Sequence, residues 1–137
     1  MNDIEKNIQS IHNYLNNKFD TVRLSTVQTG EQLLQEIKAI NPDKLPAVII
    51  IFDNLLYQSS DAVKELQLSL VLIDRFRSGS DEKALSLYQI SDKLLDLFPP
   101  NGVCLDNSYI IPTDMMSTAI DKQYAAFALG ITCKESY

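Results

Sequence analysis

Residues 45–76 read LPAVIIIFDNLLYQSSDAVKELQLSLVLIDRF, and this stretch decides the fold. It contains two apolar runs, 46–52 and 65–76, bounded by Pro, Asp, Asn and Ser. Runs of this length and composition are typical of β-strands. We therefore expect two neighbouring strands at the centre of a sheet. The first carries apolar side chains on both faces, so neither face should meet much water.

The second of these strands has two different faces. One face begins with polar residues and becomes apolar only at Val71 and Ile73. The other is uniformly leucine, because successive side chains of a strand point to opposite sides of the sheet; its members are Leu66, Leu68, Leu70 and Leu72. We expect the leucine face to lie on the core.

The connection between the two strands, residues 53–64, is too long for a tight hairpin. It carries Leu55, Leu56 and Tyr57 among polar residues. Two interpretations stay open: a projecting arm whose apolar side chains contact a partner, or a loop whose apolar side chains fold back onto the core.

Helical periodicity appears in three segments. Apolar residues at helical spacing predict an amphipathic helix over 4–15 and a second one over 81–98, which Pro99 and Pro100 end. A shorter helix over 33–40 should stop at Asn41-Pro42.

The remaining segments predict further strands. Residues 19–27 alternate as a half-polar strand near a sheet edge, and 103–111 indicate an interrupted strand whose Pro112 favours an edge or a strand end. Residues 113–121 are interpreted as a connection. The final strand, 123–133, has a face of Ala126, Ala128 and Gly130, which allows another backbone to approach closely.

This order of elements predicts an α+β fold with a mainly antiparallel sheet of four to five strands and two to three helices packed on one face. Strands adjacent in sequence without a helical crossover favour antiparallel pairing. The length of 137 residues predicts a single domain, 1–137, large enough to bury a core.

Composition narrows the function classes. With 45% hydrophobic and 22% charged residues the chain is typical of a globular protein, and its net charge of −6 disfavours tight nucleic-acid binding. The apolar runs fall short of a membrane span, and the amino terminus has no basic region followed by an apolar one. We expect the protein to remain in the cytoplasm, where it is made.

Enzyme chemistry finds little support in the residue pattern. The four glycines are too widely spaced for a phosphate-binding loop, and His12, the single histidine, is interpreted as a helix-surface residue. Cys104 and Cys133 are expected to be reduced thiols, and Asp53 to form a turn with Asn54. We therefore expect no catalytic, cofactor or metal site; an enzyme using carboxylates that the sequence does not group remains an alternative.

The layout as a whole resembles phage tail-terminator (tail-completion) proteins of the Mu-like prophage type. The resemblance rests on an amphipathic first helix, the strand entry LPAV at 45–48, a long second strand, a helix closed by Pro-Pro and a final pair of strands. It implies a structural protein of the virion tail, without catalytic residues, that forms a ring of typically six subunits. Such a ring stops tail-tube polymerisation and presents a surface to the neck proteins.

A ring would cover apolar or small groups that a monomer must otherwise bury. On that basis the predicted subunit or partner contacts are Leu55, Leu56, Tyr57, Val71, Ile73, Ala126 and Ala128. The alternative function is a monomeric or dimeric adaptor domain that binds a partner peptide along an exposed sheet edge.

Overall fold

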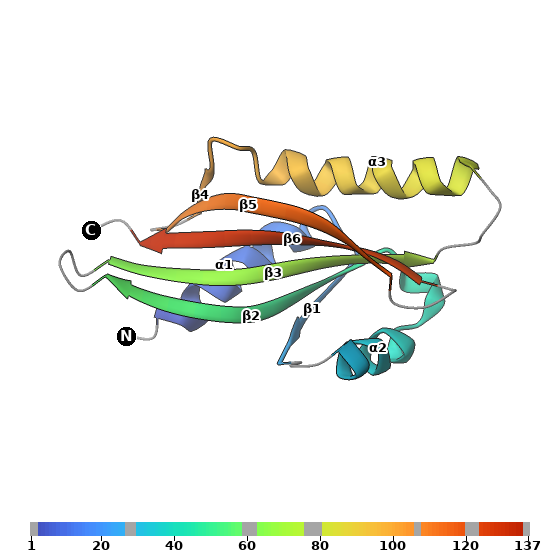
Figure 1. Cartoon of the computed structure of the whole chain (residues 1–137), viewed down its shortest axis with the longest axis horizontal. Helices are drawn as coiled ribbons and strands as arrows, with labels where there is room; N and C mark the ends of the chain where they lie inside the picture. Colours follow the sequence, from blue (N-terminus) through green and yellow to red (C-terminus); the bar gives the residue numbers. More distant parts are fainter. Residues whose placement is uncertain are drawn as a thin grey trace.

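The computed structural model describes residues 3–26, 30–58, 63–75, 81–105, 108–119 and 124–135. Figure 1 shows the elements in these ranges as a long curved sheet with helices on both sides. Its helices are α1 (Asp3–Asn16), α2 (Gly30–Ala39), the short 3-10 turn η1 (Pro42–Lys44) and α3 (Asp81–Leu97). Its strands are β1 (Thr21–Ser25), β2 (Ala47–Gln58), β3 (Val63–Arg75), β4 (Val103–Leu105), β5 (Ser108–Ala119) and β6 (Tyr124–Glu135).

The six strands form one mixed sheet in the order β1-β2-β3-β6-β5-β4. β1 and β2 are parallel, whereas the other neighbouring pairs are antiparallel. The α+β class is confirmed, but the predicted mainly antiparallel sheet of four to five strands is corrected to a six-stranded mixed sheet. The physical reason is α2, which lies between β1 and β2 in the chain and provides the crossover that a parallel pair requires.

The central strands are longer than the sequence indicated. β2 continues to Gln58 and β3 begins at Val63, so the predicted 53–64 connection is wrong for most of its length. β2 does not end at the polar residues Asp53 and Asn54. A β-bulge between Phe52 and Asn54 accommodates them, and the strand continues beyond it. Residues 59–62 lie outside the described ranges.

The same error occurs in β5. Residues 113–119 were predicted to belong to a connection, yet β5 runs without a break from Ser108 to Ala119. Pro112 is accommodated beside a second bulge, between Pro112 and Asp114. A proline that lacks its N–H is tolerated there because β4 pairs with β5 only as far as Ile110.

One face of the sheet is covered by α1 and α3. Ile11 and Leu15 of α1 pack with Leu94 of α3 against the leucine face of β3, and the core that they share extends to Leu129 and Ile131 of β6. The leucine face was therefore predicted correctly. Tyr14 ties the two helices together, because its hydroxyl donates to the carbonyl of Leu97 at 2.8 Å and its ring meets Phe98 edge-on.

The opposite face is covered at one end by α2. Ile37 and Ile40 pack over Ala47 and Ile49 of β2 and over the apolar end of β3. The prediction that the helices lie on one face is therefore wrong for α2. This helix is the part of the chain that covers the second, apolar half of the β3 face.

Candidate assembly surface

The predicted contact residues fall into three different environments. Val71, Ile73 and Ala126 are buried in the cluster beneath α2, with Val71 only 5% exposed. Because the chain covers these side chains itself, their apolar character needs no partner to explain it. Ala128 is half-buried, lies next to the same cluster and borders the open part of the sheet face.

The three residues of the predicted arm lie in β2. Leu55 pairs with Leu66 across the strand and packs against the main core, which favours the interpretation that apolar residues fold back. The backbones of Leu56 and Tyr57 pair with Glu65 and Lys64 of β3. The side chains of Leu56 and Tyr57 lie outside what the structure describes, so their contact role stays a prediction.

Beyond α2 the second sheet face is open and hollowed. A depression of about 480 Å³ lies over the middle of the sheet. Its lining combines polar and apolar residues from β2, β3, β5 and β6: Asp53, Gln67, Leu68, Ser69, Thr113, Asp114, Met116, Ala128, Gly130, Ile131 and Thr132.

The two β-bulges, one in β2 and one in β5, lie on opposite sides of this depression. Both are next to the same row of paired residues across the strands. Ser69 pairs with Gly130 at the centre of that row, and Gly130 pairs with Asp114 beyond it. On the other side the bulge brings Asp53 close enough to accept a hydrogen bond from the Ser69 hydroxyl at 2.6 Å. A bulge re-aims the side chain that it carries, and here each bulge brings an aspartate to the rim of the depression.

A side chain at Gly130 would require Asp114 and Thr113 to move. A Cβ built on it would lie 2.5 Å from Oδ1 of Asp114 and 2.6 Å from Oγ1 of Thr113. The predicted small-residue face therefore does allow a close approach, but by side chains of the neighbouring strand β5 of the same chain.

The outer edges of the two long strands are only partly paired. β1 pairs with β2 from Ala47 to Ile51, and β4 pairs with β5 from Ser108 to Ile110. Within the described ranges no strand pairs with the outer edge of β2 from Phe52 onward or with that of β5 beyond Ile110. Unpaired N–H and C=O groups at a sheet edge are a template for adding another strand.

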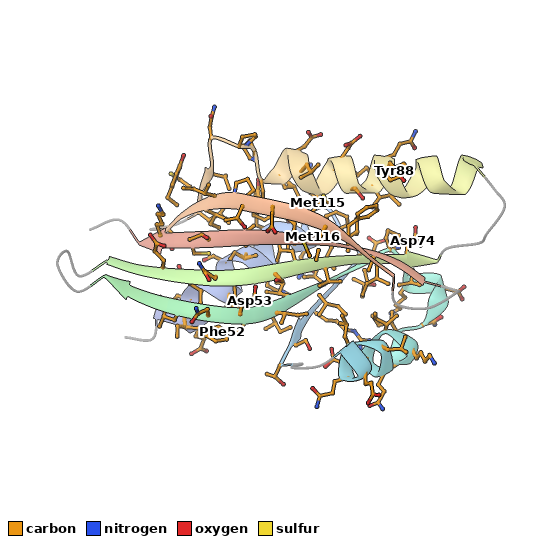
Figure 2. All side chains as sticks on the ribbon, viewed as in Figure 1. Phe52, Asp53, Asp74, Tyr88, Met115 and Met116 are labelled. Carbon is orange, nitrogen blue, oxygen red and sulfur yellow. The ribbon has the colours of Figure 1, made fainter. Side chains whose placement is uncertain are left out.

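Exposed apolar side chains accompany both edges. Phe52 is 47% exposed at the start of the unpaired part of β2, and Met116 is 60% exposed on the unpaired part of β5. Figure 2 shows these two residues on β2 and β5, on either side of the central strands β3 and β6. Large apolar groups left in water at such edges are contact material rather than catalytic groups.

The residues considered for chemistry are dispersed. His12 is half-buried and bonds the carbonyl of Val22 through Nε2 at 3.2 Å, which attaches α1 to β1. Cys104 is exposed, whereas Cys133 is buried, and burial raises the pKa of the Cys133 thiol to about 12. Within the ranges described, no three His, Cys, Asp or Glu side chains gather closely enough to hold a metal ion.

The described helices include none that is long and apolar enough to cross a membrane. No protein-family model matches this chain, and no curated protein sequence is significantly similar to it. The case for function therefore rests on the geometry of the sheet.

The sequence did not predict the unpaired edges of β2 and β5. The unpaired edges depend on where β1 and β4 end relative to β2 and β5, and pairing length has no local sequence signal. The bulges had a partial signal, because a polar pair follows an apolar run at Asp53-Asn54 and a proline interrupts β5 at Pro112.

Proposed function

We propose that the chain is a phage or prophage structural protein of the tail-terminator type, which forms a ring that caps the tail tube and joins it to the head. The observation that carries the proposal is the incomplete pairing at both edges of the sheet. β2 extends past β1 on one side, and β5 extends past β4 on the other. A chain with one unfinished edge on each side is suited to repeated head-to-tail contact with copies of itself.

Two further features support a structural role. The order of elements keeps the layout on which the resemblance to tail terminators rests, with the Pro-Pro at the end of α3 and a final pair of long strands. The net charge of −6 suits a ring through which DNA must slide without sticking. In this proposal the protein assembles in the cytoplasm and then becomes part of the virion tail.

The decisive experiment is binding to tail tubes from the phage whose genes flank the gene for this chain. We expect the purified protein to appear by electron microscopy as a ring at one end of each tube. Tubes that remain bare would exclude the terminator function, and so would neighbouring genes that are all unrelated to tails or heads. Leu95→Lys, at an exposed position on α3, serves as a surface control that should still bind.

A second candidate is an adaptor domain that binds an extended segment of another protein along a sheet edge. The same unpaired backbone of β2 favours it, because strand addition needs only a free edge and pockets for alternate side chains. Solution mass separates the two classes: an adaptor stays a monomer or dimer at high concentration, whereas a terminator forms larger species alone or on its tube.

A further inference from the structure

The unpaired parts of β2 and β5 lie at opposite ends of the sheet. Among the described strands, β1 pairs with five of the twelve residues of β2 and leaves 52–58 without an outer partner; β4 pairs with three of the twelve residues of β5 and leaves those beyond Ile110 without one. β2 and β5 run in opposite directions, because each of the three pairings between them is antiparallel. Figure 1 shows β1 beside one end of β2 and β4 beside the other end of β5, with α3 running along the same side of β5 as β4.

We propose that the edge of β2 at 52–58 in one copy pairs antiparallel with the edge of β5 at 114–119 in the next copy, so that the sheets of neighbouring subunits join. This inference rests on the self-assembly part of the proposed function and names the surface and the partner that carry it. The partner is a second copy of this chain, not an unrelated peptide.

The directions of the strands fit such a contact. When a second copy is placed beside the first in the same orientation, its β5 comes next to β2 and runs opposite to it. Antiparallel strands form evenly perpendicular hydrogen bonds and pair slightly more stably than parallel ones.

The lengths of the strands fit as well. The second copy must shift along the strand direction by about six residues, roughly 20 Å at ~3.3 Å per residue, to bring the two unpaired halves together. With that shift, β1 of the first copy lies in line with the end of β5 of the second, and β4 of the second lies beyond Gln58. In this arrangement β1 and β4 lie beyond the ends of the two contacting segments and do not block the contact.

The 114–119 edge begins beyond the β5 bulge and is compatible with pairing, whereas the 52–58 edge must pair across the bulge between Phe52 and Asn54. Pro112, which has no N–H to donate, lies just outside the 114–119 stretch. Phe52 and Met116, both largely exposed in one copy, would move from water into the joint. Because two different edges are used, the contact is heterologous and each copy keeps one edge for the next, which is what a ring needs.

Disulfide trapping tests the pairing directly. In a Cys104→Ser background, Asn54→Cys is combined with Thr118→Cys, and in a second variant with Met116→Cys, which samples a neighbouring register. A bond within one copy is excluded. β3 and β6 lie between β2 and β5, so three inter-strand spacings of ~4.8 Å separate them by about 14 Å, whereas a disulfide requires Cα atoms within about 7 Å. Leu95→Cys with Thr118→Cys is the control.

We expect the first two variants to form a ladder of covalent dimers and higher multimers on a non-reducing gel after mild oxidation, and the control to form none above its background. An assembled protein that gives no ladder in either variant would overturn the edge pairing and leave the ring proposal standing. A protein that stays monomeric at millimolar concentration and on tail tubes would overturn both. Met116→Lys should abolish the oligomer, whereas retention of the native oligomer in that variant would also contradict the pairing.

Discussion

The centre of the sheet and its two outer edges differ in how completely the chain itself pairs their backbone and buries their side chains. β3 and β6 pair with neighbours on both sides along almost their whole length, and the leucine face of β3 is covered by two helices. β2 and β5 are equally long, but among the described strands β1 pairs only with 47–51 of β2 and β4 only with 108–110 of β5, and each long strand carries a large exposed apolar side chain beyond that point. The centre pairs its backbone and buries its side chains within the chain, whereas parts of the two edges have no partner among the described strands and expose large apolar side chains. The difference indicates that stability and assembly are carried by different residues.

Val71→Asp gives the largest expected effect. Val71 lies beneath α2 with 5% of its surface exposed, so an aspartate there would be a buried charge with no partner provided for it. We expect a loss of about 4 kcal/mol or more in the free energy of unfolding, measured by urea titration. A variant that stays as stable as the native chain and only fails to assemble would place Val71 on a subunit surface instead.

Leu70→Ala should be the next most severe change. Leu70 is fully buried between Ile50 and Leu129 in the register of the sheet, and truncation would leave a cavity. The expected cost is about 3 kcal/mol in urea unfolding. Ser69→Ala, one residue away on the open face, is the matched control and should cost under ~1 kcal/mol.

Gly102→Ala tests the turn that leads from α3 to the edge strand β4. Gly102 has a φ of 86°, a conformation that disfavours side chains, and an added Cβ would lie 2.5 Å from the ring of Tyr109. We expect about 2 kcal/mol of destabilisation, read from the midpoint of thermal or urea unfolding. If the substitution leaves that midpoint unchanged, the turn does not hold β4 in the way described.

Phe52→Lys and Met116→Lys should show the reverse pattern. Both residues lie on unpaired edges, so each variant should change the free energy of unfolding by less than about 0.5 kcal/mol. Lysine on an edge opposes strand addition, and both variants should remain monomeric in sedimentation experiments under conditions where the native chain assembles. Strong destabilisation of the monomer would contradict the distinction between centre and edge.

The two cysteines give the smallest and simplest test. Cys104 is exposed on the edge strand β4 and should react with a thiol reagent at pH 8, whereas Cys133, buried on β6, should react only after unfolding. Burial raises the pKa of Cys133 from 9.0 to about 12, so the stability gained from burying a neutral thiol is fully present below pH 9 and is lost as the pH rises towards 12. Rapid labelling of both thiols in the folded protein would contradict this placement.

The sequence correctly predicted the buried face of β3 and the edge position of the 19–27 strand, but it mispredicted where β2, β3 and β5 begin or end. The leucine alternation from Leu66 to Leu72 identified the buried face of β3, because burial on one side imposes a period of two on a strand. The polar residues at 53–54 were interpreted as a break because they interrupt an apolar run, and Pro112 as an edge position or a strand end. In the structure both are absorbed by bulges, which change the register of one pair without ending the strand.

The sequence did not predict that α2 covers Val71, Ile73 and Ala126. The alternation indicated that their face of the sheet becomes apolar and must be covered, but α2 was expected on the other face. Only the parallel pairing of β1 with β2 brings α2 over this cluster. Pairing partners and helix placement are long-range properties, so residue spacing within one segment does not encode them.

Amide hydrogen exchange on the assembled and the monomeric protein tests the central claim most directly. We predict that protection increases on assembly at 52–58 and 114–119, while the central strands β3 and β6 are slow to exchange in both states. Unchanged exchange at both edges in a demonstrably assembled sample, with new protection elsewhere, would contradict the claim that a second copy completes the unfinished sheet.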